Sequence, residues 1–300
     1  MTAEVEVYQP ANHIRVVTAT SLFDGHDAAI NIMRRILQDT GVEVIHLGHN
    51  RSVQEIVDAA IEEDAQGIAV SSYQGGHIEF FKYMIDLLKE KGASHIKVFG
   101  GGGGVIVPDE IAELESYGVT KIYSPEDGAR LGLQGMINHM VAALDFSTVK
   151  KDGFAFDELS PQNKLLVANL ITAAEYAKAQ ENGDLAALRA GLAQKIAKRK
   201  PPVIGITGTG GAGKSSLTDE LILRMLHDIK DIHIAIISCD PSRRKTGGAL
   251  LGDRIRMNAI GNPRVYLRSL ATRQSQTEIP AVLGEAIEAV MAAGYDLIIA

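Results

Sequence analysis

A glycine-rich run in the second half of the chain ends in a lysine and a serine, a combination that binds phosphate. Residues 208–215 match the pattern G-x-x-x-x-G-K-[ST]. The residues expected to contact a nucleotide are Gly208, Gly211, Ala212, Gly213, Lys214, Ser215 and Ser216. In such a loop the backbone N–H groups and the start of the following helix face the phosphates. We expect Lys214 to neutralise the β- and γ-phosphates and Ser215 to bind Mg²⁺.

In the first half of the chain, three segments of small and polar residues follow apolar runs. They are Asp24-Gly-His26, Ser71-Ser-Tyr73 with Gly75-Gly-His77, and the glycine run 100–104. If the apolar runs are neighbouring parallel strands, the three segments meet at one edge of a sheet. Glycine there lets a ligand pass close to the main chain, so we expect a long, narrow slot. Taken alone, Asp-Gly-His is more often a turn with a capping aspartate than a metal site.

The elements that must hold these segments alternate along the chain. Strands are predicted at residues 14–20, 43–47, 67–72, 96–100 and 121–123, with amphipathic helices between them. In the first helix apolar residues recur every three or four positions, which places them on one face. Five strands that alternate with helices predict an α/β domain with a flavodoxin-like parallel sheet of order 2-1-3-4-5. We assign residues 1–145 to this domain.

The second half is predicted to contain a helical linker and part of a P-loop NTPase α/β domain. Residues 146–200 are rich in alanine and leucine and predict two helices, at 165–180 and 185–198. Over residues 201–300 we expect strands at 203–207, 233–238 and 295–300, with helices at 214–227 and 279–292. Because the chain stops inside a strand that should be buried, we expect it to be part of a longer protein.

Composition excludes several other classes of protein. A net charge of −7 argues against a nucleic-acid partner, which usually requires clustered basic residues. The single cysteine, Cys239, excludes a disulfide framework within the chain. No stretch reaches the ~18 uninterrupted apolar residues of a membrane span, and the N-terminus lacks an apolar signal run. We therefore expect a cytoplasmic protein with neither a membrane nor a nucleic-acid partner.

The three segments of the first half resemble the pattern of cobalamin-dependent mutases and corrinoid methyltransferases. The matching residues are Asp24, His26 and Ala29, then Ser71 and Tyr73, then Gly100 and Gly101. The resemblance implies that the nucleotide tail of cobalamin enters the slot and that His26 replaces the tail base as cobalt ligand. Asp24 would hold the other ring nitrogen, which fixes the tautomer of a ligating imidazole. Ser71 would hydrogen-bond the tail, and the other residues would line it.

The residues after the phosphate loop resemble the signature of GTPases that act as chaperones for methylmalonyl-CoA mutase. The likeness rests on residues 238–242 and 246–257. It implies that Asp240 and Asp253 help to hold Mg²⁺, that Arg256 contacts the nucleotide, and that the nucleotide is GTP. The alternative is that Asp240 caps a helix and Asp253 lies on the surface.

The order of the two modules is similar to that in a family of fused isobutyryl-CoA mutases, in which a substrate-binding barrel follows the GTPase. This resemblance implies an adenosylcobalamin-dependent rearrangement of isobutyryl-CoA to n-butyryl-CoA by a homodimer, with GTP hydrolysis controlling cofactor loading. The acyl-CoA would bind to the barrel, and we expect no catalytic residue in this portion. Two alternatives stay open: a corrinoid protein for methyl transfer, and a cobalamin-delivery or cobalamin-sensing protein with an attached GTPase.

Overall fold

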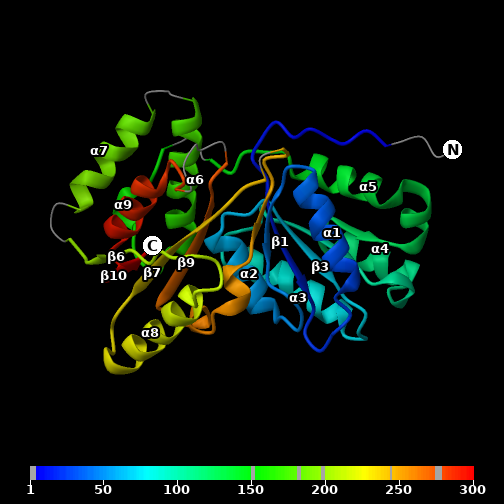
Figure 1. Ribbon diagram of the computed structural model, residues 1–300. Helices are drawn as coiled ribbons and strands as arrows, with labels where there is room; N and C mark the ends of the chain where they lie inside the picture. Colours follow the sequence, from blue (N-terminus) through cyan, green and yellow to red (C-terminus); the bar gives the residue numbers. More distant parts are fainter. Residues whose placement is uncertain (1–4, 150–152, 181–183, 197–199, 244, 274–278) are drawn as a thin grey trace. The chain divides into compact units, whose positions relative to one another are not determined.

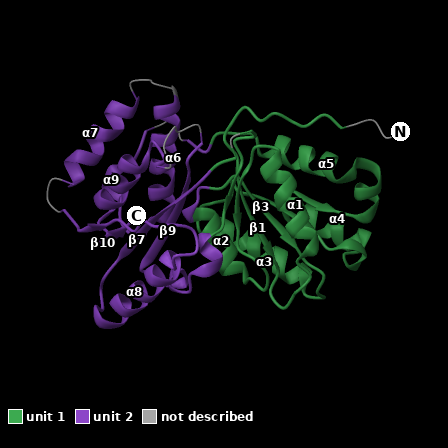
Figure 2. Cartoon of the chain, viewed as in Figure 1, with its two compact units in different colours: residues 1–61, 65–147, 242–252 green, residues 62–64, 148–241, 253–300 purple. Residues whose placement is uncertain are grey.

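The computed structural model describes residues 5–149, 153–180, 184–196, 200–243, 245–273 and 279–300 (Figure 1). The chain forms two compact units (Figure 2). Unit 1 comprises residues 1–61, 65–147 and 242–252, and unit 2 comprises residues 62–64, 148–241 and 253–300. In the described parts of the chain, no helix is both long and apolar enough to cross a membrane.

Unit 1 is built on a six-stranded parallel sheet of order β5-β4-β3-β1-β2-β8. Its strands are β1 (Arg15–Thr20), β2 (Glu43–His46), β3 (Gly67–Ser71), β4 (Lys97–Gly101), β5 (Lys121–Tyr123) and β8 (Ala249–Leu251). The first five strands have the predicted flavodoxin-like order, so this part of the fold is confirmed. β1, β2 and β3 are buried along their whole length, as expected for strands covered on both faces.

Among the described residues of unit 1, five α-helices and a short 3₁₀ turn follow the first five strands. They are α1 (Ala28–Asp39), α2 (Val53–Glu62), α3 (His77–Glu90), η1 (Gly103–Val105), α4 (Pro108–Tyr117) and α5 (Pro125–Leu144). One core lies between the sheet and the helices α1 and α5, where Leu37 and Ile137 pack with Val16 and Phe99. The apolar periodicity of the first helix therefore faces the sheet, as predicted.

The sixth strand, β8, comes from a segment of the chain far from the other five. It pairs in parallel with β2 at the edge of the sheet. The segment is further held by an ion pair between Arg243 and Asp39 and by a hydrogen bond from the Thr246 hydroxyl to the Gln38 carbonyl. We did not predict this strand. The division of the chain at residues 145 and 200 stays a prediction.

Unit 2 is a four-stranded parallel sheet of order β6-β10-β7-β9 with helices on both faces. Its strands are β6 (Val203–Ile204), β7 (Ile234–Asp240), β9 (Val265–Ala271) and β10 (Leu297–Ile299). Its helical elements are η2 (Phe156–Glu158), α6 (Lys164–Gln180), α7 (Asp184–Ile196), α8 (Lys214–Asp228), η3 (Asp253–Arg256), η4 (Ala259–Gly261) and α9 (Leu283–Ala293). The two predicted linker helices are present as α6 and α7. They pack with α9 on one face of the sheet, and α8 covers the other face.

Candidate cobalamin and nucleotide sites

The register of the sheet brings the three segments of the first half to one level. Thr20 of β1 lies opposite Ser71 of β3, and Ser71 lies opposite Gly101 of β4. The strands are parallel, so the loops that follow them leave the sheet at the same edge. The structure therefore brings together the segments that the sequence analysis grouped.

Asp24 and His26 form a hydrogen-bonded pair in the loop between β1 and α1. The Asp24 carboxylate is 1% exposed, whereas the His26 side chain is 77% exposed. His26 Nδ1 lies 2.8 Å from Asp24 Oδ1, and the His26 backbone N–H donates to the same oxygen at 2.9 Å. The other carboxylate oxygen accepts the backbone N–H of Tyr73. An imidazole that donates Nδ1–H to a carboxylate keeps the lone pair of Nε2 for a metal.

These hydrogen bonds also keep Asp24 ionised. Burial by itself would raise the pKa of the Asp24 carboxyl, but the N–H groups of Tyr73 and His26 together hold it below its ordinary value. The carboxylate is thus charged at neutral pH and can anchor the imidazole. The His26 ring in turn lies 5.6 Å from the Tyr73 ring, centroid to centroid.

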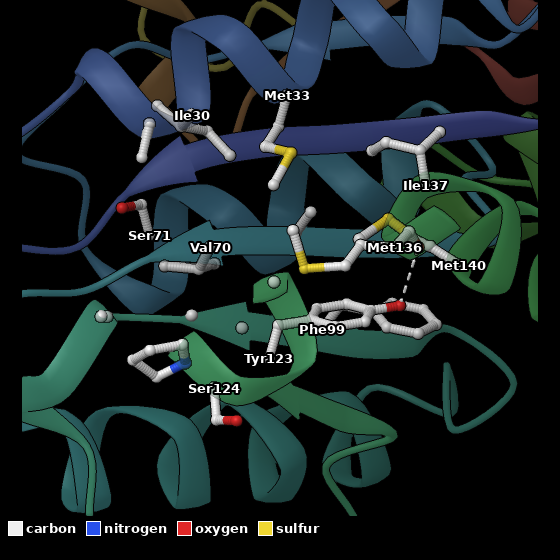
Figure 3. Close-up of a pocket in the computed structure, with 18 of the residues that line it drawn as sticks. Ile30, Met33, Val70, Ser71, Phe99, Tyr123, Ser124, Met136, Ile137 and Met140 are labelled. Atoms are coloured by element: carbon white, nitrogen blue, oxygen red, sulfur yellow. Dashed lines mark hydrogen bonds between the residues drawn. The ribbon is translucent and has the colours of Figure 1, made fainter. Parts of the chain in front are cut away.

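An apolar cavity of about 260 Å³ opens between the sheet and the helices α1 and α5 (Figure 3). Its lining includes the predicted residues Ser71, Tyr73, Gly100 and Gly101. Other lining side chains, which we did not predict, are Ile30, Met33, Phe99, Tyr123, Met136, Ile137 and Met140. Met33 could have been predicted from the helical periodicity of α1, because the face of this helix that packs on the sheet also lines the cavity. The cavity is a slot of the kind that a narrow, largely apolar group could enter.

The glycines at the end of β4 and directly after it differ in the space that a side chain would find. A Cβ on Gly100 would lie 2.5 Å from the Phe81 ring, and a Cβ on Gly102 would lie 2.0 Å from the Ser72 carbonyl oxygen. A Cβ on Gly101 would meet only the Tyr123 carbonyl oxygen, at 3.5 Å, an ordinary contact. Gly100 and Gly102 are therefore required by the packing of the protein itself. Gly101 leaves space for a ligand, so the cavity and the Asp24–His26 pair fit a cobalamin.

His77, for which the sequence analysis predicted no role, connects the starts of two helices near this site. Its side chain is 4% exposed, and its Nδ1–H donates to the Gln74 carbonyl oxygen at 3.1 Å. Its Nε2 lies 3.0 Å from the Glu110 carboxylate, which also accepts the Val107 N–H. The pair ties the start of α3 to the start of α4 and so anchors the α4 end of the glycine-rich loop between β4 and α4.

In unit 2 the phosphate loop leads into α8 as predicted. Gly213 precedes the helix with φ +83°, a left-handed conformation that is readily available to glycine. The residues Gly208, Gly211, Ala212 and Ser216 are exposed. Lys214 Nζ donates to the carbonyl oxygens of Gly208 at 2.8 Å and Thr209 at 3.1 Å. The lysine thus spans the loop that phosphates would enter.

The predicted magnesium ligands lie around the start of α8. Ser215 Oγ donates to Asp253 Oδ1 at 3.3 Å, and the Ser238 hydroxyl donates to the other oxygen of Asp253. Asp240 Oδ2 is buried and has no hydrogen-bond partner among the described residues. Burial and the nearby charges of Asp253 and Glu63 raise the pKa of Asp240 to about 7, and Arg256 opposes this. This excess of negative charge beside the phosphate loop fits a bound cation.

The described residues contain no group of three or more histidine, cysteine, aspartate or glutamate side chains arranged around a metal position. Mg²⁺ bound with a nucleotide does not require such a group, because phosphates and waters supply most of its ligands. The site geometry is therefore that of a P-loop, in which one hydroxyl and one or two carboxylates complete the shell.

Comparison with protein families finds two domain models along the chain. A family model described as the B12 binding domain matches residues 14–131. A second model, described as the methylmalonyl-CoA mutase-associated GTPase MeaB, matches residues 167–300. The chain thus contains a cobalamin-binding domain and a GTPase domain, and the expected cofactors cobalamin, GTP and Mg²⁺ are confirmed at this level.

Comparison with individual proteins gives matches over almost the whole chain. The chain is 63% identical over 295 residues to the fused isobutyryl-CoA mutase of Geobacillus kaustophilus, which covers 98% of this chain and 27% of the relative. It is 60% identical over 291 residues to that of Cupriavidus metallidurans, with 97% and 26% covered. Over almost its whole length the chain is therefore similar to part of the fused isobutyryl-CoA mutases. It spans about a quarter of the length of these relatives.

The cobalamin-binding part is also similar to a mutase small subunit. The 2-hydroxyisobutanoyl-CoA mutase small subunit of Aquincola tertiaricarbonis is 36% identical over 110 residues, which cover 36% of this chain and 79% of that protein. The flavodoxin-like part of this chain is therefore similar to most of the length of a mutase small subunit.

Proposed function

We propose that the chain is the cofactor-binding and nucleotide-binding part of an adenosylcobalamin-dependent acyl-CoA mutase that converts isobutyryl-CoA to n-butyryl-CoA. The observation that carries this proposal is the Asp24–His26 pair beside the apolar cavity. A buried carboxylate that orients an exposed imidazole is the arrangement that a metal-binding histidine requires. A preformed slot next to it gives the displaced nucleotide tail a place to bind.

In this proposal each residue of the first site has a separate task. His26 binds cobalt through Nε2, and Asp24 holds Nδ1–H and keeps the ring in place. Ser71 hydrogen-bonds the tail, while Tyr73, Gly100 and Gly101 line it and exclude water. When bound, adenosylcobalamin supplies the radical chemistry of the carbon-skeleton rearrangement.

The second site binds GTP and Mg²⁺ in this proposal. The backbone of residues 208–213 and Lys214 hold the phosphates, and Ser215, Asp240 and Asp253 hold Mg²⁺ directly or through water. Arg256 contacts the nucleotide in this proposal. It lies near the site, because its charge lowers the pKa of Asp240. GTP hydrolysis would control the loading or protection of the cofactor.

The remaining features concern the whole protein. The relatives are about four times as long as this chain, which supports a further domain that binds the acyl-CoA. We propose that the whole protein is a cytoplasmic homodimer. Conversion of isobutyryl-CoA to n-butyryl-CoA by the full-length gene product, with adenosylcobalamin added, tests the choice of acyl group.

The direct test is to titrate the chain with adenosylcobalamin and record the visible spectrum. We expect binding with the tail base displaced from cobalt. The variant His26→Ala should lose this spectral change and keep GTP binding, and Lys214→Ala should do the reverse. Cobalamin that binds with its own base still on cobalt, or that does not bind at all, would contradict the proposal.

A further inference from the structure

Phe23 stands immediately before Asp24, and its backbone conformation is unusual. Its φ is +63°, in the left-handed region that bulky L-residues rarely occupy. Burial of the side chain does not compensate for this conformation. The residue is 86% exposed, more than any other large hydrophobic residue among those described. A strained backbone and an exposed aromatic ring at the same residue indicate a functional reason for keeping it.

The strained conformation is enforced by specific hydrogen bonds. The Phe23 N–H donates to Asn50 Oδ1 at 2.8 Å, and the Asp24 N–H donates to the Ser21 carbonyl oxygen at 3.1 Å. Asn50 also has a left-handed backbone, with φ +57°, which asparagine tolerates better than phenylalanine. The loop is therefore held in a conformation that presents the Phe23 ring to solvent, rather than being free to turn it inward.

The ring is presented beside the residue that we assign to cobalt. Phe23 and His26 are three residues apart, so their Cα atoms are at most ~10 Å apart. Both side chains are exposed, and the His26 ring is flanked by Tyr73. A flat macrocycle that binds end-on through His26 Nε2 must extend sideways over the residues around this histidine.

We propose that Phe23 is part of the seat of the corrin ring, with its aromatic side chain packed against the face of the macrocycle that His26 approaches. This inference rests on the proposed function, because it takes cobalamin as the ligand of His26. The left-handed backbone places the ring, and burial of its apolar surface under the corrin compensates for the strain in the complex. Phe23 is thus a cofactor-binding residue outside the resemblance on which the other site residues were assigned.

The test separates the aromatic ring from the backbone conformation. In Phe23→Asn the ring is lost, but the left-handed conformation becomes easier to adopt, so the thermal midpoint should rise. The dissociation constant of adenosylcobalamin should nevertheless increase about 10- to 30-fold, as expected from the loss of a partly buried aromatic contact. In Phe23→Leu an apolar side chain remains, and the affinity should fall only about 3-fold.

The spectrum and a matched variant complete the experiment. Bound cobalamin should keep its tail base displaced in Phe23→Asn, since His26 and the cavity are unchanged. Tyr83→Ala removes another exposed aromatic residue, in the middle of α3, and should leave cobalamin affinity unchanged. If Phe23→Asn binds cobalamin as tightly as the unmodified chain, Phe23 serves another contact and the inference is wrong. If the unmodified chain itself does not bind cobalamin, the proposed function fails first.

Discussion

Asp24 in unit 1 is saturated with hydrogen-bond donors, whereas Asp240 in unit 2 has a buried oxygen without one. The pKa of Asp24 is accordingly lowered, and that of Asp240 is raised to about 7. The same contrast holds for the two key side chains. His26 is oriented and exposed, while Lys214 donates to carbonyl groups of its own loop.

The difference shows that the two sites depend on their ligands to different extents for the balance of charge. The cobalamin site balances its charges without a ligand, so its geometry is set by the fold. The nucleotide site carries uncompensated carboxylates, and it reaches electrostatic balance only when a cation and phosphates are bound. Mg²⁺ and GTP should therefore stabilise unit 2, because they bind to the folded unit and not to the unfolded chain.

The largest effect is expected for the phosphate loop. Lys214→Ala should weaken GTP binding by roughly 100-fold or more, because it removes charge-assisted hydrogen bonds to phosphate. Cobalamin binding should be unchanged. Isothermal titration with each ligand measures both, and Lys230→Ala, which removes an exposed lysine elsewhere in unit 2, is the matched control. Full GTP affinity in Lys214→Ala would remove the phosphate-loop assignment.

Two neighbouring glycines should respond in different ways. Gly102→Ala should destabilise unit 1 by about 3 kcal/mol, because the new Cβ would overlap the Ser72 carbonyl oxygen. Gly101→Ala should fold normally and weaken cobalamin binding, because its Cβ would take up space in the cavity. Thermal unfolding and cobalamin titration of the two variants test this. A normal cobalamin affinity in Gly101→Ala would show that the tail does not pass this residue.

Acidification should destabilise unit 1 and stabilise unit 2, because the pKa of His46 is lowered and that of Asp240 is raised. Burial and the charges of Arg34 and Arg51 lower the pKa of His46 to about 4. Between pH 6.5 and pH 4 the histidine is therefore protonated in the unfolded chain but neutral in folded unit 1. Its stability should be complete above pH 6.5 and fall by about 2–3 kcal/mol as the pH drops to 4. Hydrogen exchange read by mass spectrometry over β1 and β2 measures this. The variant His46→Asn should flatten the profile, and an unchanged profile would count against the buried neutral histidine.

The smallest effects compare the two aspartates directly. Asp24→Asn should destabilise unit 1 by about 2 kcal/mol, since it weakens hydrogen bonds to a charged group. Asp240→Asn should stabilise unit 2 without nucleotide by about 1 kcal/mol, because it removes an unbalanced buried charge. The gain should be complete above pH 7 and shrink as the pH falls from 7 towards 4, where Asp240 is protonated anyway.

An exposed aspartate gives the control for this pair. Asp228→Asn, whose side chain is 72% exposed, should change stability by less than about 0.5 kcal/mol. Chemical denaturation with and without Mg²⁺–GTP measures all three variants. If Asp24→Asn and Asp240→Asn shift stability in the same direction, the contrast between the two sites is wrong.

The elements that carry the sites could be predicted from the sequence because their patterns are local. The five strands of the flavodoxin-like sheet begin and end within one residue of the predicted positions. The order of the strands then followed from the alternation with helices, and it placed Asp24, Ser71 and Gly101 at one edge. Position in the sheet, rather than any single residue, is what groups these residues as a candidate cobalamin site.

The elements that were missed depend on distant partners. β8 has three residues, and its partner β2 lies about 200 residues earlier in the chain, so no local pattern indicates it. β9 is buried along its length, but Arg268 and Ser269 interrupt its apolar pattern. Arg268 Nη2 donates to Thr172 and Glu175, and the Ser269 hydroxyl donates to Glu63. Only the fold brings these partners together. β6 in turn ends at Ile204, before the predicted end of the strand.

The central claim is that His26 replaces the tail base of cobalamin on cobalt. It can be tested with the chain labelled with ¹⁵N-histidine, loaded with cobalamin and reduced to the Co(II) state, by electron paramagnetic resonance. We predict that the nitrogen splitting changes from the triplet of ¹⁴N to the doublet of ¹⁵N, and that His26→Ala abolishes the doublet. A triplet that persists in the labelled chain would show that the tail base is still bound, and it would contradict the account.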